Sequence, residues 1–406
     1  MKKMFDTCAL LDAVEQGCEL KDFYISSITL EEIEHIKTSN YKDEHTKFQA
    51  RKASLFLKKN VDIYNVILYT TTIDNILQER NLPLTNDNKI IASCGSEMEF
   101  ITNDLNAALI ARNIFGLQVR SLAKTDEQYT GYIELHPTDA QLNELYSSDC
   151  SHNIFNALVN QYVILYNEAN EVIDTLCWTG TKYRKLKFKP FDSKWFGQVK
   201  AKKGDVYQQC ACDALLHSQI TCIQGPAASG KSYLALGYLM SLLEAEEIDK
   251  IVIYVNPVPV RGAGTLGWYK GTKNEKLLDS QIGNFLISKI GGIEEVERLI
   301  ETDKIILLPI SDCRGFDTTE MRAGVYMTEA QNMSVDLMKL IIQRTGEDSI
   351  VIIEGDSCGQ IDSVLYSGLN NGMRRMSKVF RDKECYAEVW LKNIYRSEIA
   401  KIAEAM

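Results

Sequence analysis

The 406-residue sequence lacks the features that would place it in a membrane or on an export route. No apolar run approaches the roughly 18 residues that a membrane-spanning helix requires. No secretory signal is recognisable, because Lys2 and Lys3 lead into a very short apolar run that ends at Asp12. These absences predict a cytoplasmic protein with no membrane partner.

Cysteine pairs of metal-binding spacing and a positive net charge are also missing. The eleven cysteines include no two C-x-x-C pairs, and Cys210 and Cys212 are too close for a usual zinc half-site. They are therefore expected to be reduced thiols. The net charge is −10, so any nucleic-acid binding must come from a local patch. The length predicts two to three domains.

The most specific motif begins after Ile220–Ile223, a short apolar run of strand length. Gly225-Pro-Ala-Ala-Ser-Gly-Lys-Ser232 follows and matches G-x-x-x-x-G-K-[ST] at every fixed position. Its glycines let successive backbone N–H groups point at an anion. Lys231 is expected to reach the β- and γ-phosphates of ATP, and the Ser232 hydroxyl to bind Mg²⁺.

The pattern Tyr233–Leu243 is helical, so its positive N-terminus would face the same phosphates. Strand, loop and helix occur in the order that phosphate binding requires, whereas a chance glycine-rich turn would not need them. Gln208, ahead of the loop, is a candidate for the adenine edge or a solvated helix residue. The candidate nucleotide-binding residues of this stretch are Gln208, Gly225, Pro226, Ala227, Ala228, Ser229, Gly230, Lys231, Ser232 and Tyr233.

Residues 4–119 alternate strand-like and helix-like segments in the order β-α-β-α-α-β-α, which predicts a small α/β domain with a mostly parallel sheet. Phe23–Ile28 is the second strand of this pattern, and a capped helix starts at Thr29. Four acids are placed where strands give way to helices: Asp6, Glu32, Asp87 and Asp104.

In a parallel sheet these acids could converge, because ligand sites gather at the carboxyl ends of the strands. A cluster of like charges is costly unless a cation occupies it, and Mg²⁺ or Mn²⁺ is the natural occupant. Such an ion activates water for attack on a phosphodiester. Acids are also common at helix N-termini, where the helix dipole favours them. The spacing alone leaves both readings open.

Residues 125–195 form a connector with strand-like, helix-like and again strand-like segments. Its end and the residues after it are the most basic part of the chain, and aromatic residues are interleaved there. Basic residues neutralise phosphates and aromatics stack on bases, which together suit single-stranded nucleic acid. A half-buried sheet with lysines on its outer face is the alternative. The residues are Lys182, Arg184, Lys185, Lys187, Lys189, Lys194, Lys200, Lys202 and Lys203, with Tyr183, Phe188, Phe191, Trp195 and Phe196.

The last 200 residues continue the nucleotide-binding pattern. Lys250–Val255, Ile305–Pro309 and Ser349–Glu354 are expected to be buried strands, and Val325–Asn332 is an apolar strand that ends in polar groups at the Walker B position. Parallel strands separated by helices, with the triphosphate at their carboxyl ends, describe a P-loop domain.

Four segments resemble the blocks of a PIN domain, a metal-dependent ribonuclease fold: FDTCALLD, ISSITLEEIE, LTNDNKIIASC and FITNDLNAALIAR. By position, Asp6, Glu32, Asp87 and Asp104 match that family's acidic tetrad. Glu31 is a rival to Glu32, since only one of two adjacent glutamates can face inward. Thr102 matches a hydroxyl that the family often places beside the last acid.

Residues 200–406 resemble the PhoH family of ATPases, which are related to superfamily-one helicases. VNPVPVRGAGTLGWYKGTKNEKL, CRGFD, IIQRTGEDS, EGDSCGQID and YRSEIA match its blocks. The resemblance implies nucleotide contacts by Arg344, Asp356, Gln360 and Arg396, and catalytic roles for Lys231, Glu329 and Gln331. YTGYIEL in the connector matches as well, so the whole chain resembles two-domain PIN–PhoH proteins.

That resemblance implies ATP-dependent unwinding of RNA coupled to metal-dependent RNA cleavage, in a homo-oligomeric, hexameric ring. The expected domains are a PIN-like nuclease at 1–124, an RNA-binding connector at 125–195 and a P-loop ATPase at 196–406. ATP and Mg²⁺ (or Mn²⁺) are the expected cofactors, and single-stranded RNA is the expected partner.

The sequence departs from the family at the Walker B position, where Asp-Glu-Ala-Gln is replaced by Thr328-Glu329-Ala330-Gln331. The aspartate normally orients Mg²⁺, whereas Thr328 carries no charge. Losing such a group costs on the order of 10–100-fold in metal affinity or activity. Impaired rather than absent hydrolysis is therefore expected. The alternative is a nucleotide-binding regulatory module with a crippled ATPase that only scaffolds RNA or partners.

Overall fold

The computed structural model of the chain describes residues 2–15, 17–39, 42, 44–122, 129–186, 190–255, 278, 280–359 and 371–395. The chain divides into two compact units, residues 1–128 and 129–406. None of the helices in the described ranges is long and apolar enough to cross a membrane. The predicted site residues Gln360 and Arg396 lie outside those ranges, as do Lys187, Phe188, Lys189 and residues 256–277.

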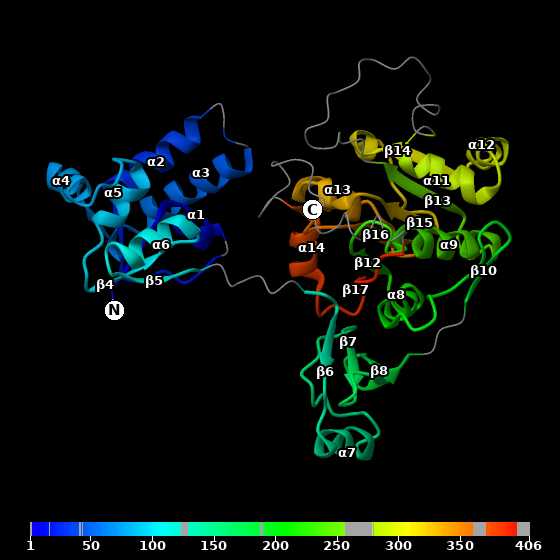
Figure 1. Cartoon of the computed structure of the whole chain (residues 1–406). Helices are drawn as coiled ribbons and strands as arrows, with labels where there is room; N and C mark the ends of the chain where they lie inside the picture. Colours follow the sequence, from blue (N-terminus) through cyan, green and yellow to red (C-terminus); the bar gives the residue numbers. More distant parts are fainter. Residues whose placement is uncertain are drawn as a thin grey trace. The chain divides into compact units, whose positions relative to one another are not determined.

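The first unit is an α/β domain around a parallel sheet, which confirms the predicted fold class (Figure 1). The strands follow the spatial order β3-β2-β1-β4-β5: β1 (Lys2–Phe5), β2 (Phe23–Ser26), β3 (Tyr64–Ile67), β4 (Met98–Ile101) and β5 (Gln118–Arg120). The helices are α1 (Thr7–Glu15), α2 (Ser27–Thr38), α3 (Glu44–Lys59), α4 (Thr71–Glu79), α5 (Asn86–Ala92) and α6 (Leu105–Asn113), with a short 3-10 turn, η1 (Val61–Ile63).

Helix caps decide where these strands stop. The Ser26 hydroxyl accepts a hydrogen bond from the Ile28 amide and caps α2, so β2 ends at Ser26. The predicted strand Phe23–Ile28 was therefore two residues too long. The Asp104 carboxylate accepts from the Ala107 amide at 2.7 Å and caps α6 in the same way. The elements β3, α4 and β5 were not predicted.

The second unit begins with a small mixed sheet, which we call the connector sheet. It runs in the order β6-β7-β8-β9, with β6 parallel to β7 and the other neighbours antiparallel. Its elements are β6 (Tyr132–Leu135), α7 (Asp139–Ser147), β7 (Tyr162–Tyr166), β8 (Val172–Trp178) and β9 (Tyr183–Lys185). A two-stranded antiparallel ribbon follows, β10 (Phe191–Ser193) and β11 (Gly197–Val199).

The rest of the unit is a parallel sheet in the order β14-β13-β15-β16-β12-β17. Its strands are β12 (Ile220–Gln224), β13 (Lys250–Val255), β14 (Ile305–Pro309), β15 (Ala323–Met327), β16 (Ile350–Gly355) and β17 (Tyr386–Trp390). The predicted strand Val325–Asn332 stops at Met327, because Ala330–Asn332 forms the 3-10 turn η3. β17 was not predicted.

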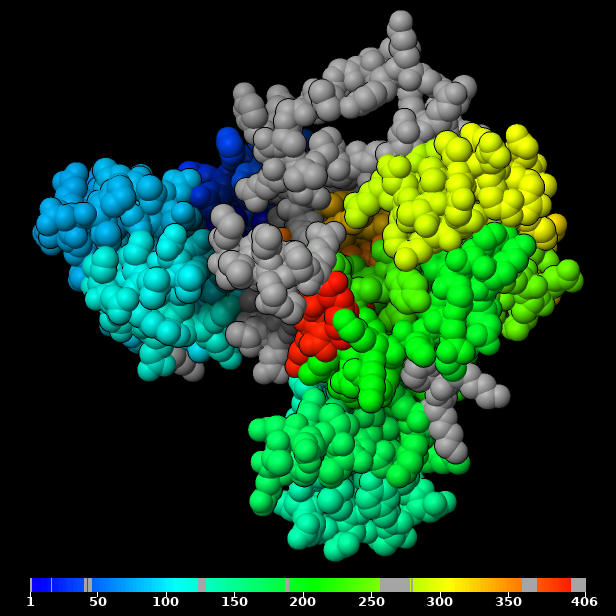
Figure 2. All heavy atoms as spheres, turned by 45° about the vertical axis from the view of Figure 1, so that its right-hand side comes forward, coloured from blue at the N-terminus to red at the C-terminus, as the bar shows by residue number. Residues whose placement is uncertain are grey.

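Helices cover both faces of this sheet. One face packs against α8 (Val206–His217), α9 (Lys231–Glu244), α11 (Gln281–Ile290) and α12 (Ile293–Glu301). The other packs against η2 (Ile310–Gly315), α13 (Val335–Ile342) and α14 (Gly372–Phe380). Figure 2 shows the green atoms of the α9 region beside the yellow atoms of α11 and α12 on the first of these faces. A parallel sheet buried on both faces is the architecture of a P-loop nucleotide-binding domain.

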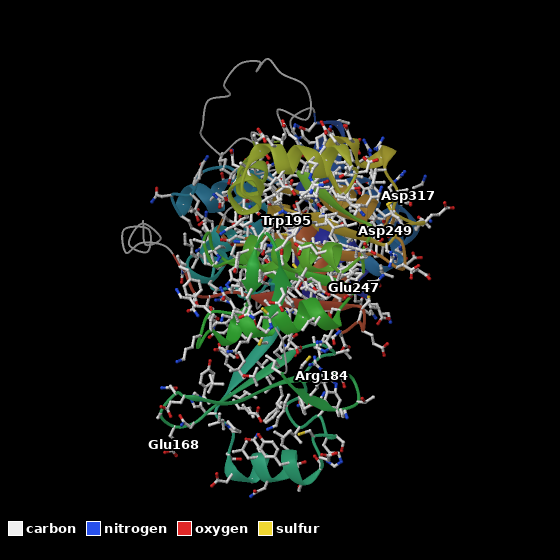
Figure 3. The ribbon with its side chains drawn as sticks, turned by 90° about the vertical axis from the view of Figure 1, so that its right-hand side faces the viewer. Glu168, Arg184, Trp195, Glu247, Asp249 and Asp317 are labelled. Atoms are coloured by element: carbon white, nitrogen blue, oxygen red, sulfur yellow. The ribbon has the colours of Figure 1, made fainter. Side chains whose placement is uncertain are left out.

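Three of the aromatic residues in the basic stretch pack inside the protein. Tyr183, Phe191 and Phe196 are 3%, 5% and 8% exposed, so they are core residues and cannot stack on bases. Arg184 points from the connector sheet toward α8, where it donates two 2.7 Å hydrogen bonds to the carboxylate of Asp213 (Figure 3). The expectation that these residues bind RNA was wrong for these four, although exposed lysines of the stretch remain.

We expect Arg184→Met to lower the free energy of unfolding by about 3 kcal/mol, because it removes the guanidinium from the fully buried Asp213 carboxylate and leaves that group with Tyr162 and His217. Lys185→Met is the matched control. Lys185 pairs with Asp174 but is 57% exposed, so its loss should cost about 0–1 kcal/mol. Urea unfolding of the full chain measures both values. Equally small losses would mean that Arg184 does not tie the connector sheet to α8.

Candidate nucleotide site and acidic pocket

The phosphate loop, residues 225–232, leaves the carboxyl end of β12 and leads into α9. Gly225 and Gly230 have φ values of 140° and 96°, which side chains rarely adopt. A Cβ atom at Gly225 would lie 2.4 Å from the Leu391 carbonyl oxygen, and one at Gly230 would lie 2.8 Å from the Gln208 amide nitrogen. Both glycines of the motif are therefore required by the fold as well as by the anion.

Two polar side chains of the loop, Lys231 and Ser229, are available to contact a ligand. Lys231 Nζ donates to the carbonyl oxygens of Gly225 and Pro226 at 2.7 and 2.9 Å, so its ammonium lies over the loop. The Ser229 hydroxyl is fully buried and finds no hydrogen-bond partner among the residues that the structure describes, which is costly unless a ligand supplies one. These features fit the phosphates of a nucleotide.

Gln208 backs this loop rather than projecting into solvent. It is 5% exposed, which rules out the solvated alternative. Its side-chain amide donates to the Ser229 carbonyl at 2.8 Å and accepts from the Lys202 amide at 2.8 Å. Tyr395 supports the same loop, since its backbone N–H donates to the Ala228 carbonyl at 3.0 Å. Tyr233, on the first turn of α9, packs against Phe196.

The predicted catalytic residues Glu329 and Gln331 follow β15 at the same edge of the sheet. Glu329 has a left-handed backbone with φ of 51°, a strained conformation for a non-glycine residue. Gln331 is fully buried, donates to the Glu329 carboxylate at 2.6 Å and accepts from the Asp356 amide at 3.2 Å. Gln331 thus joins the candidate base to the loop that follows β16.

An acid that the sequence did not single out lies in this site. Glu354 on β16 is 3% exposed and accepts hydrogen bonds from the Ser232 and Thr328 hydroxyls. Burial raises the pKa of Glu354, while the Lys231 cation acts in the opposite direction. The sequence held a signal for this acid, since Glu354 continues a strand directly after the apolar run Ile350–Ile353, where charged residues are rarely buried without a partner.

Two further predicted nucleotide contacts, Asp356 and Arg344, lie in different parts of the domain. The Asp356 carboxylate accepts from the amides of Cys358 and Gly359, so it caps its own turn beside the site. Arg344 comes after the carboxyl end of α13, beside Thr318, where the chain returns to the amino end of β16. The structure thus gathers the phosphate loop, Glu329, Gln331 and Asp356 at one edge, and Arg344 does not belong to this group.

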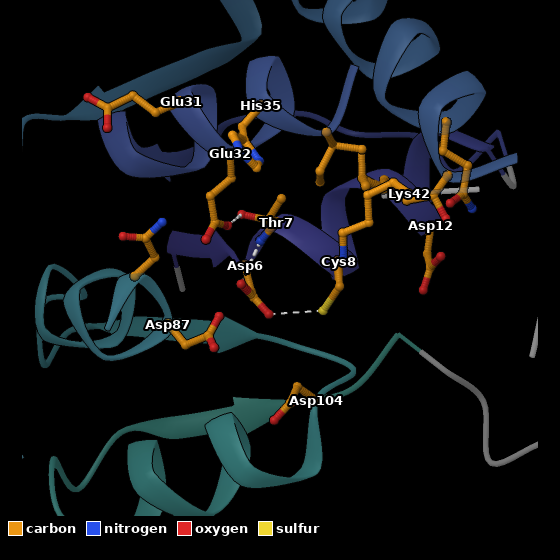
Figure 4. Close-up of a pocket in the computed structure, with 15 residues that line it drawn as sticks. Asp6, Thr7, Cys8, Asp12, Glu31, Glu32, His35, Lys42, Asp87 and Asp104 are labelled. Carbon is orange, nitrogen blue, oxygen red and sulfur yellow. Dashed lines mark hydrogen bonds between the residues drawn. The ribbon is translucent and has the colours of Figure 1, made fainter. Parts of the chain in front are cut away.

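In the first unit the four predicted acids meet. Asp6, Glu32, Asp87 and Asp104 all line one open pocket of about 730 Å³, at the carboxyl ends of β1, β2 and β4 (Figure 4). Thr102 donates to the Asp6 carboxylate at 2.9 Å and accepts from the Asp104 amide at 3.0 Å. The hydroxyl that the resemblance predicted therefore joins the first acid to the last.

Glu32, and not Glu31, faces the other acids. The Thr7 hydroxyl donates to the Glu32 carboxylate at 2.5 Å, and Thr7 directly follows Asp6. Glu31 is exposed, and Figure 4 shows its carboxylate directed away from the group. Both residues line the pocket, but adjacent positions on α2 point about 100° apart, which explains why only Glu32 faces the other three acids.

Electrostatics in the pocket fit a cation. Burial raises the pKa of Glu32, and the charges of Asp87 and Asp6 add to this rise. Burial likewise raises the pKa of Asp87, with further contributions from Asp6 and Asp104. Carboxylates that destabilise one another offer the hard oxygen donors that Mg²⁺ and Mn²⁺ prefer. In the described ranges, however, no three acidic, histidine or cysteine side chains are close enough to form a complete ligand set.

These two sites define a P-loop nucleotide-binding protein that carries an acid-lined α/β domain of nuclease type. The PhoH-like protein family matches residues 199–406, just over half of the chain, and the PIN domain family matches residues 4–122. The chain therefore belongs to the PhoH-like proteins, with a PIN domain at its N-terminal end.

Relatives extend over both domains. The chain is similar to Protein PhoH2 of Bacillus subtilis, with 26% identity across 80% of this chain and 79% of the relative. It is also similar to Protein PhoH2 of Thermobispora bispora, with 25% identity across 79% and 74%. The crystal structure of VapBC2 from Rickettsia felis bound to a promoter DNA fragment covers 30% of this chain and 98% of its own at 18% identity, but the TM-score is only 0.22.

Proposed function

We propose that the chain is an ATP-hydrolysing, helicase-like enzyme that acts on single-stranded RNA and cleaves it with its PIN domain. The observation that carries the proposal is the gathering of the phosphate loop, Glu329 and Gln331 at one edge of the sheet, in a chain that also holds the four-acid pocket. Family membership supports nucleotide binding and a nuclease-like domain.

In the ATPase, the phosphate oxygens of ATP would replace the two loop carbonyls as acceptors for Lys231. The backbone N–H groups at the start of α9 add a favourable dipole. Glu329 would hold the attacking water and accept its proton, while the Gln331 amide keeps that carboxylate oriented. Mg²⁺, bound by the Ser232 hydroxyl, would supply the charge that neutralises the reacting phosphates.

In the PIN domain, the four acids that line the pocket would hold Mg²⁺ or Mn²⁺ once their side chains close on the ion, and the bound metal would supply the activation of water for attack on a phosphodiester. Thr7 and Thr102 fix the orientations of Glu32 and Asp6 through their hydroxyl groups. The open pocket leaves room for a single strand, whereas a deep cavity would exclude a polymer.

The partners and the compartment are proposals as well. Exposed lysines of the basic stretch, such as Lys182, Lys200 and Lys203, would track the RNA backbone, and the assembly would be a hexameric ring. All eleven cysteines are free thiols, which supports a reducing cytoplasm.

The test is ATP turnover by the purified full chain with and without single-stranded RNA, together with RNA cleavage in the presence of Mg²⁺ or Mn²⁺. We expect turnover that RNA stimulates, and cleavage that a chelator abolishes. The second candidate, a nucleotide-binding scaffold, is favoured by Thr328 at the Walker B position. ATP binding without turnover under any of these conditions would establish the scaffold and reject the enzyme.

A further inference from the structure

One buried acid of the nucleotide site has no place in the scheme above. Glu354 lies on β16, the strand between β15 and the phosphate-loop strand β12. Its carboxylate accepts hydrogen bonds from the Ser232 hydroxyl at 2.9 and 3.0 Å, and from the Thr328 hydroxyl at 3.0 Å. A buried carboxylate thus joins the hydroxyl expected to bind Mg²⁺ to the residue that replaces the Walker B aspartate.

We propose that Glu354 is the acid that positions Mg²⁺ in this nucleotide site, in place of an aspartate at position 328. The proposal rests on the ATP binding proposed above and deepens it. If Glu354 has this role, the threonine at position 328 does not impair metal binding, because Glu354 on the neighbouring strand supplies the negative charge.

The sheet register makes this exchange geometrically possible. Met327 on β15 pairs with Ile353 on β16, so Thr328 and Glu354 occupy the next positions of the same register. Neighbouring strands are about 4.8 Å apart, and a glutamate reaches one methylene further than an aspartate. The move also brings the acid toward the phosphate loop, because β16 is the direct neighbour of β12.

The alternation of side chains places the acid on the correct face. Tyr326 on β15 and Ile352 on β16 belong to the core beneath α9. Residues two positions further along each strand, Thr328 and Glu354, point to the same face. Ser232 comes from the first turn of α9 and covers this face, which explains how it reaches the carboxylate.

The alternative is that Glu354 is only a hydrogen-bond acceptor that holds α9 on the sheet. Glu354→Gln separates the two roles, because the amide keeps an acceptor oxygen and loses the charge. A matched control is Glu388→Gln. Glu388 is a buried acid on β17 of the same sheet, and it points to the opposite face from Ala387 and Val389, which lie on the face that packs against α8.

ATP binding by the full chain is measured by calorimetry over a range of Mg²⁺ concentrations and in EDTA. We expect Glu354→Gln to raise the Mg²⁺ concentration for half-maximal ATP binding on the order of 10–100-fold, with binding in EDTA unchanged. Glu388→Gln is expected to keep the Mg²⁺ requirement of the unmodified protein.

A second variant places the acid at position 328, directly after β15, where the family pattern has an aspartate. Thr328→Asp combined with Glu354→Thr should need about as much Mg²⁺ as the unmodified protein, and it carries the test if Glu354→Gln does not fold. Thr328→Asp alone should instead lower the melting temperature without metal, because it places two carboxylates side by side.

An unchanged Mg²⁺ requirement in Glu354→Gln would overturn the inference while ATP binding by the unmodified chain stands. In the double variant, a requirement raised to the level expected for Glu354→Gln would overturn it as well. If the unmodified chain binds no ATP at any Mg²⁺ concentration, the proposed function fails and the inference fails with it.

Discussion

Replacing Glu32 with glutamine is expected to abolish Mn²⁺-dependent RNA cleavage, whereas the same change at Glu31 is expected to leave it intact. The two residues are neighbours on α2, but only Glu32 faces Asp6 and Asp87. Both variants remove one charge from the same helix, so a general effect on stability or on RNA attraction would appear in both. Cleavage of a labelled single-stranded RNA, with ATP binding as the check on folding, measures the difference.

Glu32→Gln is also expected to change how the stability of the metal-free protein depends on pH. Because the folded-state pKa of Glu32 is raised, its contribution to stability is lost as the pH rises through that pKa. Glu32→Gln removes this loss, so the metal-free variant should melt at a higher temperature than the unmodified protein above neutral pH.

In the cleavage experiment, activity retained by Glu32→Gln, or lost equally in Glu31→Gln, would show that the pocket is not a nuclease centre.

Replacing Lys231 with alanine is expected to lower ATP affinity at least tenfold, which is about 1.4 kcal/mol, and to remove ATP turnover. Lys231 is the cation whose ammonium already lies over the phosphate loop. Lys304→Ala is the control, because Lys304 is an exposed lysine at the amino end of β14, the opposite edge of the sheet. Calorimetry at saturating Mg²⁺ measures both affinities, and equal affinities would remove the basis for a P-loop enzyme.

The parts of the fold that were predicted correctly depend on short stretches of sequence. The order of β12, the phosphate loop and α9 was predicted because the strand, the glycines and the helical pattern are contiguous. Asp6, Asp87 and Asp104 were predicted because each stands directly after a strand or near the start of a helix, where parallel topology brings chain ends together. Glu32 lies inside α2, and it was selected over Glu31 only by the family resemblance.

Contacts between distant residues could not be predicted in this way. Ser232 and Glu354 are 122 positions apart, and only the strand order places β16 beside β12. The basic stretch shows the same limit, because its pattern is typical both of an RNA-binding strand and of one covered by helices. For Arg184, the hydrogen bonds to Asp213 on α8 show that its side chain is used inside the protein. Nothing near Arg184 in the sequence reveals that partner.

The order of strands also fixes when each site can assemble during synthesis. The PIN sheet uses strands from the first 120 residues, so its acids can meet while most of the chain is still unmade. The phosphate loop leaves β12, and both neighbours of β12 come late, at Ile350 and Tyr386. A nascent chain would therefore hold a folded, nuclease-type domain before its nucleotide site is complete.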